Sequence, residues 1–518
     1  MQRLVVAATA LLVMAGAVVV GAYLLLFAAT TDRAARAAPA GTAIYVNVYL
    51  QPSSGQKMHL LALVGQLRGF GDAATVEDKI DEVAQRLLDQ AGVDYTTDVR
   101  TWLGTQVAVA VLPASAAGEA PHLLLLAGVK DPAAARDQVP RLMRRDGTSY
   151  TPETYRGQVA MIGEANSYAL LDDLLVLADS PEQLRAALDA DADAIPSLAD
   201  SAAFGSAMRT VTADHIASLF LNLGALATAD DGGRLGGYST AALALTAGAD
   251  GLHLEGSAPF AADRTSAEVR SAFALGSQRA TLTEWMPRST RLELVAFGLR
   301  QSLGDLEALM RESPTFAEAI GALDQLRLVA GLGLGINVDD DLLSLFDGEA
   351  ALAIADLDLS APRGQLLLRP ADPTAARRSL DKMRDALADR GSNVSTSTAD
   401  GVTITSITVP QVGGVAYAMS DGVVVLALDS ADVAAALAAH RSASALTSDD
   451  AYVAPFALLA RHGGNELWAD IAGLTDIAAT IFDPGSELRD ILHQIGELAM
   501  SASASGDHLE IHGVLTVK

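Results

Sequence analysis

Residues 130–143 read KDPAAARDQVPRLM, and residues 371–383 read ADPTAARRSLDKM. In both places an apolar run precedes an Asp-Pro pair, and an Ala- and Arg-rich segment follows it. Asp131 and Asp372 suit the N-cap position, because a carboxylate accepts hydrogen bonds from the unpaired amides of a first helical turn. The proline that follows suits the first helical position, because it lacks the amide that would stay unpaired there. Both stretches are therefore predicted to be strand-to-helix junctions.

The similarity between the two regions extends well beyond this junction. Matching segments follow one another in the same order in both halves of the chain: residues 92–111 with 337–354, 167–188 with 415–437, and 247–256 with 504–513. A chance similarity of two helix starts would not continue in this way. An ordered series of matches over about 200 residues indicates that a whole domain is duplicated.

The apolar pattern predicts an α+β fold in which helices cover one face of an antiparallel sheet. Short polar turns within apolar runs, as in LLDDLLV (170–176) and YAMSDGVVV (417–425), are typical of hairpins. Each half is expected to contain a strand, a helix, two strands, a helix, two strands, a helix, a strand, a helix and a closing hairpin.

The predicted domains occupy residues 41–262 and 281–518, with a polar linker at 263–280. A second linker, at 30–40, joins the first domain to the N-terminal segment. Two domains agree with the length of 518 residues, because single cores usually stop growing at about 250 to 300 residues.

Residues 4–29 carry no charged side chain. As a helix they would span about 39 Å at 1.5 Å per residue, more than the roughly 30 Å hydrocarbon core of a bilayer. We predict an uncleaved transmembrane anchor, with the N-terminus cytoplasmic and the body extracytoplasmic. The alternative is a cleaved signal peptide, for which Ala35 and Ala37 offer an A-x-A site.

Composition narrows the classes of partner and site. The net charge of −27 repels phosphate, so nucleic acid and anionic lipid headgroups are not expected partners. The absence of Cys excludes disulfides, thiolate metal sites and Cys nucleophiles. Packing alone must hold the predicted domains together.

The start of the predicted body resembles a known family. Residues 38–56 (APAGTAIYVNVYLQPSSGQ) and 98–104 (DVRTWLG) are similar to a bacterial family called domain of unknown function 3352. The resemblance implies an N-terminal anchor and an uncharacterised body, and it brings no catalytic residues. In the second half, residues 346–348 (FDG) replace Trp-Leu-Gly.

One short motif has metal-ligand spacing. His508, Glu510 and His512 would share a helix face, as zinc ligands do. The surrounding pattern predicts a strand instead, on which the two imidazoles would lie about 13 Å apart. An exposed strand face is therefore expected, and no metal site.

A second motif places carboxylates at calcium-loop spacing. Residues 189–200 read DADADAIPSLAD, but Ala194 stands where such a loop needs Gly. A solvated acidic loop is the prediction, with weak cation binding as the alternative.

Two further sets of residues have side chains suited to catalysis or to ligand stacking. Ser379 and Lys382 have S-x-x-K spacing but lie in a charged amphipathic helix without the accompanying motifs. Trp102, Trp285 and Trp468 are expected in cores. The sequence thus predicts no catalytic, cofactor or metal residues and no enzyme.

The resulting hypothesis is a membrane-tethered, non-enzymatic binding or scaffold protein. The alternatives are a carrier of an apolar ligand or lipid between sheet and helices, and an enzyme of unrecognised type. A pocket larger than about 300 Å³ lined by Leu, Val and Ala would favour the carrier.

Overall fold

The computed structural model describes residues 32–66, 85, 93–114, 120–145, 147–226, 239–261, 270, 277–312, 317–356, 362–409, 413–442, 444–481, 489–490, 492–505 and 507–518. The chain divides into two compact units, which consist mainly of residues 1–265 (unit 1) and 266–506 (unit 2). The predicted anchor, residues 4–29, lies outside the described residues. Among the helices that are described, none has the length and apolar character needed to cross a membrane.

The elements of unit 1 are, in chain order, α2 (Ala34–Ala37), β1 (Ile44–Tyr49), α3 (Ser54–Gln66), η1 (Tyr95–Val99), β2 (Leu103–Leu112), β3 (His122–Val129), α5 (Pro132–Met143), β4 (Thr151–Tyr155), β5 (Gln158–Ile162), β6 (Ser167–Leu170), β7 (Leu174–Ala178), α6 (Pro181–Asp191), η2 (Leu198–Asp200), α7 (Ala202–Met208), β8 (Ala217–Leu221), α8 (Leu223–Leu226), β9 (Ala241–Ala247) and β10 (Gly251–Pro259).

The second half of the chain contains η3 (Leu282–Trp285), β11 (Leu292–Phe297), α10 (Leu299–Glu312), α11 (Ala317–Val329), η5 (Ala330–Leu334), η6 (Val338–Leu342), η7 (Leu343–Phe346), β12 (Glu349–Asp356), β13 (Arg363–Arg369), α12 (Pro373–Ala388), β14 (Asn393–Ala399), β15 (Val402–Val409), β16 (Gly413–Ser420), β17 (Val423–Ala427), α13 (Ser430–Arg441), η8 (Leu446–Ser448), α14 (Asp450–Ala457), β18 (Asn465–Asp470), α15 (Ile471–Ile481), β19 (Ile495–Ser505) and β20 (His508–Val517).

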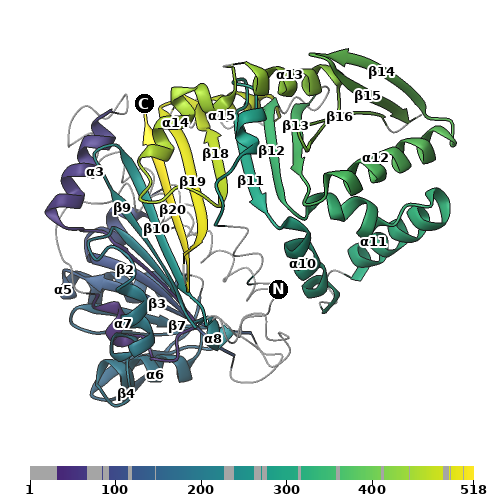
Figure 1. Cartoon of the computed structure of the whole chain (residues 1–518). Helices are drawn as coiled ribbons and strands as arrows, with labels where there is room; N and C mark the ends of the chain where they lie inside the picture. Colours follow the sequence, from purple (N-terminus) through teal and green to yellow (C-terminus); the bar gives the residue numbers. More distant parts are fainter. Residues whose placement is uncertain are drawn as a thin grey trace. The chain divides into compact units, whose positions relative to one another are not determined.

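The fold is α+β, with helices and a large antiparallel sheet, as predicted (Figure 1). In unit 1 the strands pair in the order β4-β5-β6-β7-β3-β2-β1-β8-β9-β10. In the second half the order is β14-β15-β16-β17-β13-β12-β11-β18-β19-β20. The first strand of each half is therefore an interior strand, between the second and the eighth.

Both Asp-Pro junctions form as the sequence predicts. Asp131 accepts hydrogen bonds from two amides of the first turn of α5, each at 3.0 Å. Asp372 does the same at the start of α12, at 2.9 and 3.0 Å. In each case the capped helix directly follows the strand predicted before it, β3 or β13.

The region between the capped helix and the next helix differs from the prediction. Two strands were expected there, and each half has four, β4–β7 and β14–β17. The additional strand β4 is mostly exposed, so it lacks the apolar alternation that signals a strand. Its hairpin turns at Arg156 and Gly157, both with positive φ, as two-residue hairpin turns require.

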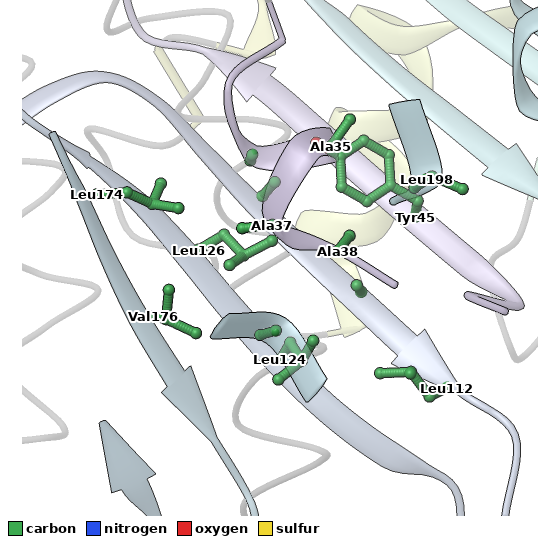
Figure 2. Packing of buried hydrophobic residues seen from close by; sticks show 14 of the residues in the cluster. Ala35, Ala37, Ala38, Tyr45, Leu112, Leu124, Leu126, Leu174, Val176 and Leu198 are labelled. Carbon is green, nitrogen blue, oxygen red and sulfur yellow. The ribbon is translucent and has the colours of Figure 1, made fainter. Parts of the chain in front are cut away.

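Small side chains allow the helical segments to approach the sheet closely. In unit 1, Ala35, Ala37 and Ala38 lie over a layer that includes Leu124 and Leu126 of β3 (Figure 2). All five of these side chains are buried. The helix α6 packs on the same strand and on β6 and β7. The small side chains of Ala35, Ala37 and Ala38 therefore let this segment pack directly on the leucines of β3.

The three tryptophans occupy core positions, which confirms their predicted role. Trp102, Trp285 and Trp468 are each at most 3% exposed. The indole of Trp468 donates to the carbonyl of Ala451, and that of Trp102 to the carbonyl of Asp98. None of them offers an exposed ring to a ligand.

Candidate functional site

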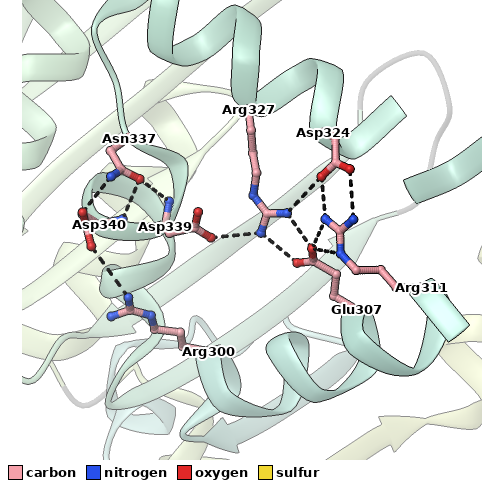
Figure 3. Close-up of polar contacts among 8 residues, drawn as sticks. All are labelled: Arg300, Glu307, Arg311, Asp324, Arg327, Asn337, Asp339 and Asp340. Atoms are coloured by element: carbon pink, nitrogen blue, oxygen red, sulfur yellow. Dashed lines mark hydrogen bonds and ion pairs between the residues drawn. The ribbon is translucent and has the colours of Figure 1, made fainter. Parts of the chain in front are cut away.

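The helices α10 and α11 of unit 2 are held together by an ion-pair network centred on Glu307 (Figure 3). Its carboxylate accepts hydrogen bonds from Arg311 at 2.6 and 2.9 Å and from Arg327 at 2.6 and 2.7 Å. Arg311 also pairs with Asp324, and Arg327 with Asp339. Donation from Arg327, and then from Arg311, lowers the pKa of Glu307 to about 2. Glu307 is therefore ionised at any ordinary pH.

The turn after α11 is fixed by side chain to backbone hydrogen bonds. Asn337 accepts from the amides of Asp339 and Asp340 at the start of η6, and its own amide group donates to the Asp340 carboxylate at 2.7 Å. Lys382 of α12 pairs with Asp341 of the same turn. The polar groups of this region thus hold the backbone in place.

A pocket of about 350 Å³ lies beside this turn, and its lining combines charged, polar, glycine and apolar residues: Arg327, Gly331, Gly335, Ile336, Asn337, Val338 and Asp339. Its size meets the criterion set for an apolar carrier, but its lining does not. The charged pair Arg327 and Asp339 is already engaged in the network. This pocket therefore gives the carrier hypothesis no support.

Three large apolar side chains at the end of α11 and in η5 are exposed, and we call them the apolar edge. Leu328 is 59% exposed, Val329 57% and Leu332 82%. They fall within five consecutive residues of the segment LVAGL. Apolar side chains gathered in this way on the surface are typical of a binding surface.

A second feature of unit 2 is a group of buried carboxylates on one face of its sheet, the carboxylate cluster: Glu293 on β11, Glu349 on β12 and Glu466 on β18. Each is at most 4% exposed. Glu466 on β18 lies opposite Val295, which is two residues after Glu293 on β11. Glu349 on β12 lies opposite Phe297, which is two residues after Val295. Because side chains alternate along a strand, all three carboxylates project from the same face.

The members of the carboxylate cluster differ in how well they are paired. Glu349 accepts from the amides of Thr281 and Leu282 at 2.6 and 2.8 Å. Glu466 lies 3.0 Å from the imidazole of His462 and 3.5 Å from the hydroxyl of Tyr452.

Glu293 is the most weakly paired member of this cluster. Its carboxylate oxygens are not paired with a side chain among the residues that the structure describes, and a hydrogen bond from the backbone of Trp468 only partly offsets its burial. Burial, and then the charge of Glu466, raises the pKa of Glu293 well above its usual value. Glu293 therefore holds a proton more readily than a solvent-exposed glutamate does.

The corresponding positions of unit 1 carry no acid. Strand register relates the two units: Tyr45 lies opposite Phe220 on β8, just as Glu293 lies opposite Trp468 on β18, so Tyr45 corresponds to Glu293. By the same register, Gln106 corresponds to Glu349 and Ser218 corresponds to Glu466. A half-buried carboxylate nearby is that of Asp32, to which Tyr45 donates at 2.6 Å and Gln106 at 3.2 Å. Burial raises the pKa of Asp32, and these bonds oppose the rise.

The metal-spaced motif lies on a strand, as expected. His508, Glu510 and His512 are alternate residues of β20, and His508 contacts Asp507. Within the described part of the chain, no three His, Asp or Glu side chains are grouped closely enough to hold a metal ion.

The acidic run at 189–200 does not form a single loop. The helix α6 continues to Asp191, and Asp193 has a positive φ of 53°. Asp189 accepts from Tyr155 at 2.9 Å and from Arg156 at 2.7 Å, while Asp200 bonds with Ser197. The carboxylates therefore act in separate contacts rather than at one point.

The S-x-x-K pair has no nucleophile that a substrate could reach. Ser379 is 7% exposed in α12, and Lys382 is paired with Asp341. A serine nucleophile needs access and a base in reach, and neither condition is met by this pair.

The carboxylate cluster and the apolar edge were both missed by sequence analysis. The cluster is spread over strands far apart in the chain, so a search for local motifs does not find it. One signal was present: in LELVAF (292–297), Glu293 has the same parity as Val295 and Phe297, which are expected to face the core. A charged residue is almost never fully buried unless it is paired, so Glu293 at such a position is unusual.

Comparison with known proteins gives a family and distant structural similarities. No curated protein matches the chain. The solved structure of TP0453 in crystal form III has 10% sequence identity and a TM-score of 0.25, covering 49% of this chain and 90% of that chain. Crystal form I of TP0453 has 11% identity and a TM-score of 0.26, covering 48% and 88%. The sequence profile of the family described as "Protein of unknown function (DUF3352)" matches residues 4–512, and the chain belongs to this family.

Proposed function

We propose that this chain is a membrane-tethered extracytoplasmic protein whose body binds or scaffolds a partner and is not an enzyme. The binding role rests on the apolar edge of Leu328, Val329 and Leu332. These side chains are exposed on a segment whose neighbouring backbone is tightly held by ion pairs. A rigid apolar surface favours binding because little conformational entropy is lost when a partner covers it.

The tether is supported by residues 4–29, which carry no charge and are long enough to span a bilayer. A single apolar segment ahead of a large, acidic, Cys-free body is the usual plan of an exported domain. We place the N-terminus in the cytoplasm and the body outside it.

We also infer that the two units arose by duplication of one domain. In support, the strands of both halves pair in one order, and each opening segment is fixed in the same way. The amide of Arg33 donates to Gln106, and that of Thr281 donates to Glu349 at the position corresponding to Gln106.

Site-specific photo-crosslinking in intact cells tests the binding role. A photoreactive residue at position 332 is expected to give a discrete adduct of higher mass. The matched control is position 428, whose Leu is 60% exposed in the same unit. Replacing Leu328 and Val329 by Ser should abolish the adduct at 332. An adduct pattern that is the same at 332 and 428, or no adduct at either, would refute a partner at the apolar edge.

The non-enzymatic part of the proposal has a separate test. Alanine is introduced singly at the positions considered for catalysis or metal binding: Ser379, Lys382, His508, Glu510 and His512. Each variant should stay folded and keep membrane insertion and crosslinking. Loss of the cellular phenotype in one folded, inserted variant would instead favour an enzyme.

A further inference from the structure

We propose that Glu293, Glu349 and Glu466 form a pH-sensitive latch, which keeps η3 and α14 seated on the sheet of unit 2 while Glu293 holds a proton and loosens them when that proton leaves. The latch does not depend on the proposed binding role. It rests on the placement of the carboxylate cluster beneath these two covering segments.

Both covering segments are attached through the cluster. Glu349 accepts hydrogen bonds from Thr281 and Leu282, at the start of η3. Tyr452 of α14 donates to Glu466 and packs edge-on against Trp468, with ring centroids 5.6 Å apart. Trp468 lies directly opposite Glu293 on the neighbouring strand. A charge on Glu293 would therefore act on the attachment of both segments.

In the described part of unit 2, the cationic side chains near the carboxylate cluster contact carboxylates other than that of Glu293. Around the cluster, the titratable or charged side chains of the packed elements include Arg291 just before β11, Glu349 on β12, Arg369 on β13, Glu466 and Asp470 on β18, Tyr452 on α14 and His462 after it, and η3 and α14 also carry Glu284 and Asp450. Arg291 is paired with Asp470 at 2.6 Å, and Arg369 lies 3.7 Å from Glu349. His462 pairs with Glu466 at 3.0 Å.

Protonation of Glu293 is the arrangement that this geometry favours. The side chain is fully buried, no described side chain pairs with it, and the hydrogen bond that it receives comes from the backbone of Trp468. An isolated carboxylate in such a place is unfavourable, and a second carboxylate close by makes it more so. Burial, followed by the charges of Glu293 and Glu466, also raises the pKa of Tyr452, so its phenol stays neutral.

The sign of the pH effect follows from the raised pKa of Glu293. The folded state keeps the proton at pH values where the unfolded chain has released it. Stability is therefore greatest below the ordinary carboxyl pKa of 4.5 and is lost as the pH rises to the raised value. Within that window the unfolding constant of unit 2 should rise about tenfold per pH unit through this group.

Unit 1 provides a natural comparison. The positions of the three acids are taken there by Tyr45, Gln106 and Ser218, none of which carries a charge near neutral pH. A latch that depends on these acids should therefore be present in unit 2 and absent from unit 1.

The test is urea unfolding of the full chain from pH 5 to 8 in a Trp102→Phe background. The chain has three tryptophans, so fluorescence then reports on Trp285 and Trp468 of unit 2 alone. The wild-type midpoint should fall as the pH rises, whereas Glu293→Gln should lose that dependence. Glu182→Gln, on the exposed surface of α6, is the control and should keep it. Glu466→Ser introduces the residue found at the corresponding position of unit 1 and removes the neighbouring charge. The pKa of Glu293 should then be raised less, so the fall of the midpoint should stop at a lower pH.

A second measurement applies even if Glu293→Gln fails to fold. The infrared carbonyl band of a protonated carboxylic acid should persist in the wild type above pH 4.5, the ordinary carboxyl pKa, and disappear as the pH rises further. Loss of every such band at the ordinary carboxyl pKa would overturn the latch. So would equal pH dependence of the midpoint in wild type and Glu293→Gln.

Discussion

Replacing Glu307 by Gln should loosen the helix pair α10 and α11. Two arginines donate to this carboxylate, and its pKa is lowered from the ordinary 4.5 to about 2. At 1.36 kcal/mol per pH unit, this corresponds to at most about 3.4 kcal/mol. Arg311 is 40% exposed and Arg327 22%, so solvent screening reduces the expected loss to about 1 to 2 kcal/mol.

Amide hydrogen exchange measures this loss locally. A change of about 1 to 2 kcal/mol corresponds to exchange about 5- to 30-fold faster in peptides from α10 and α11. Because the pKa of Glu307 is lowered, its contribution is present above pH 4.5 and is lost as the pH falls towards 2. The difference between wild type and variant should therefore shrink over the same range.

Two results would refute this explanation of the rigid helix pair. One is exchange within twofold of wild type in both helices at pH 7. The other is an equal effect of Glu182→Gln, a control in which the acid is 74% exposed and lies 3.8 Å from its arginine. Either result would show that the network of Figure 3 does not hold α11 and the apolar edge in place.

Three further predictions follow from the fold. Gly348→Ala should destabilise unit 2 by about 1 to 3 kcal/mol in urea unfolding, because the added Cβ would overlap the carbonyl of Arg369. The control is Gly331→Ala, which has open space around it and should change the free energy of unfolding by less than about 0.5 kcal/mol. Asp131→Ala and Asp372→Ala should each cost about 0.5 to 2 kcal/mol of thermal or chemical stability, and a clear difference between them would contradict their equivalence as N-caps. Protease added to intact spheroplasts should digest the body and leave a small membrane-bound stub, while full protection or a soluble mature form would contradict the proposed topology.

Local features were predictable from sequence, and features assembled across strands were not. The caps at Asp131 and Asp372 were predicted because a cap involves residues adjacent in the chain. The hairpin containing Asp421 was predicted for the same reason. The exposed strand β4 was not, because its side chains face solvent and show no apolar alternation.

The carboxylate cluster illustrates the same limit at the level of a site. Glu293 and Glu466 meet only because β11 pairs with β18, far along the chain. Parity within each strand indicates that the two side chains face the core, but register decides that they lie on neighbouring positions. The apolar edge was equally hidden, because the letters LVAGL do not show whether the segment is buried, and only the structure shows Leu332 exposed.

The strand order has a consequence for how each unit folds. The first strand of a unit, β1 or β11, pairs on one side with the second strand and on the other with the eighth. Pairing of residues so distant in sequence closes a large loop before its contacts form, and such topologies fold slowly, on a timescale of milliseconds to seconds. Until the eighth strand is available, the first strand exposes an unpaired edge, to which another chain can add. Neither unit can therefore complete its sheet, or protect that edge, before its eighth strand has been synthesised.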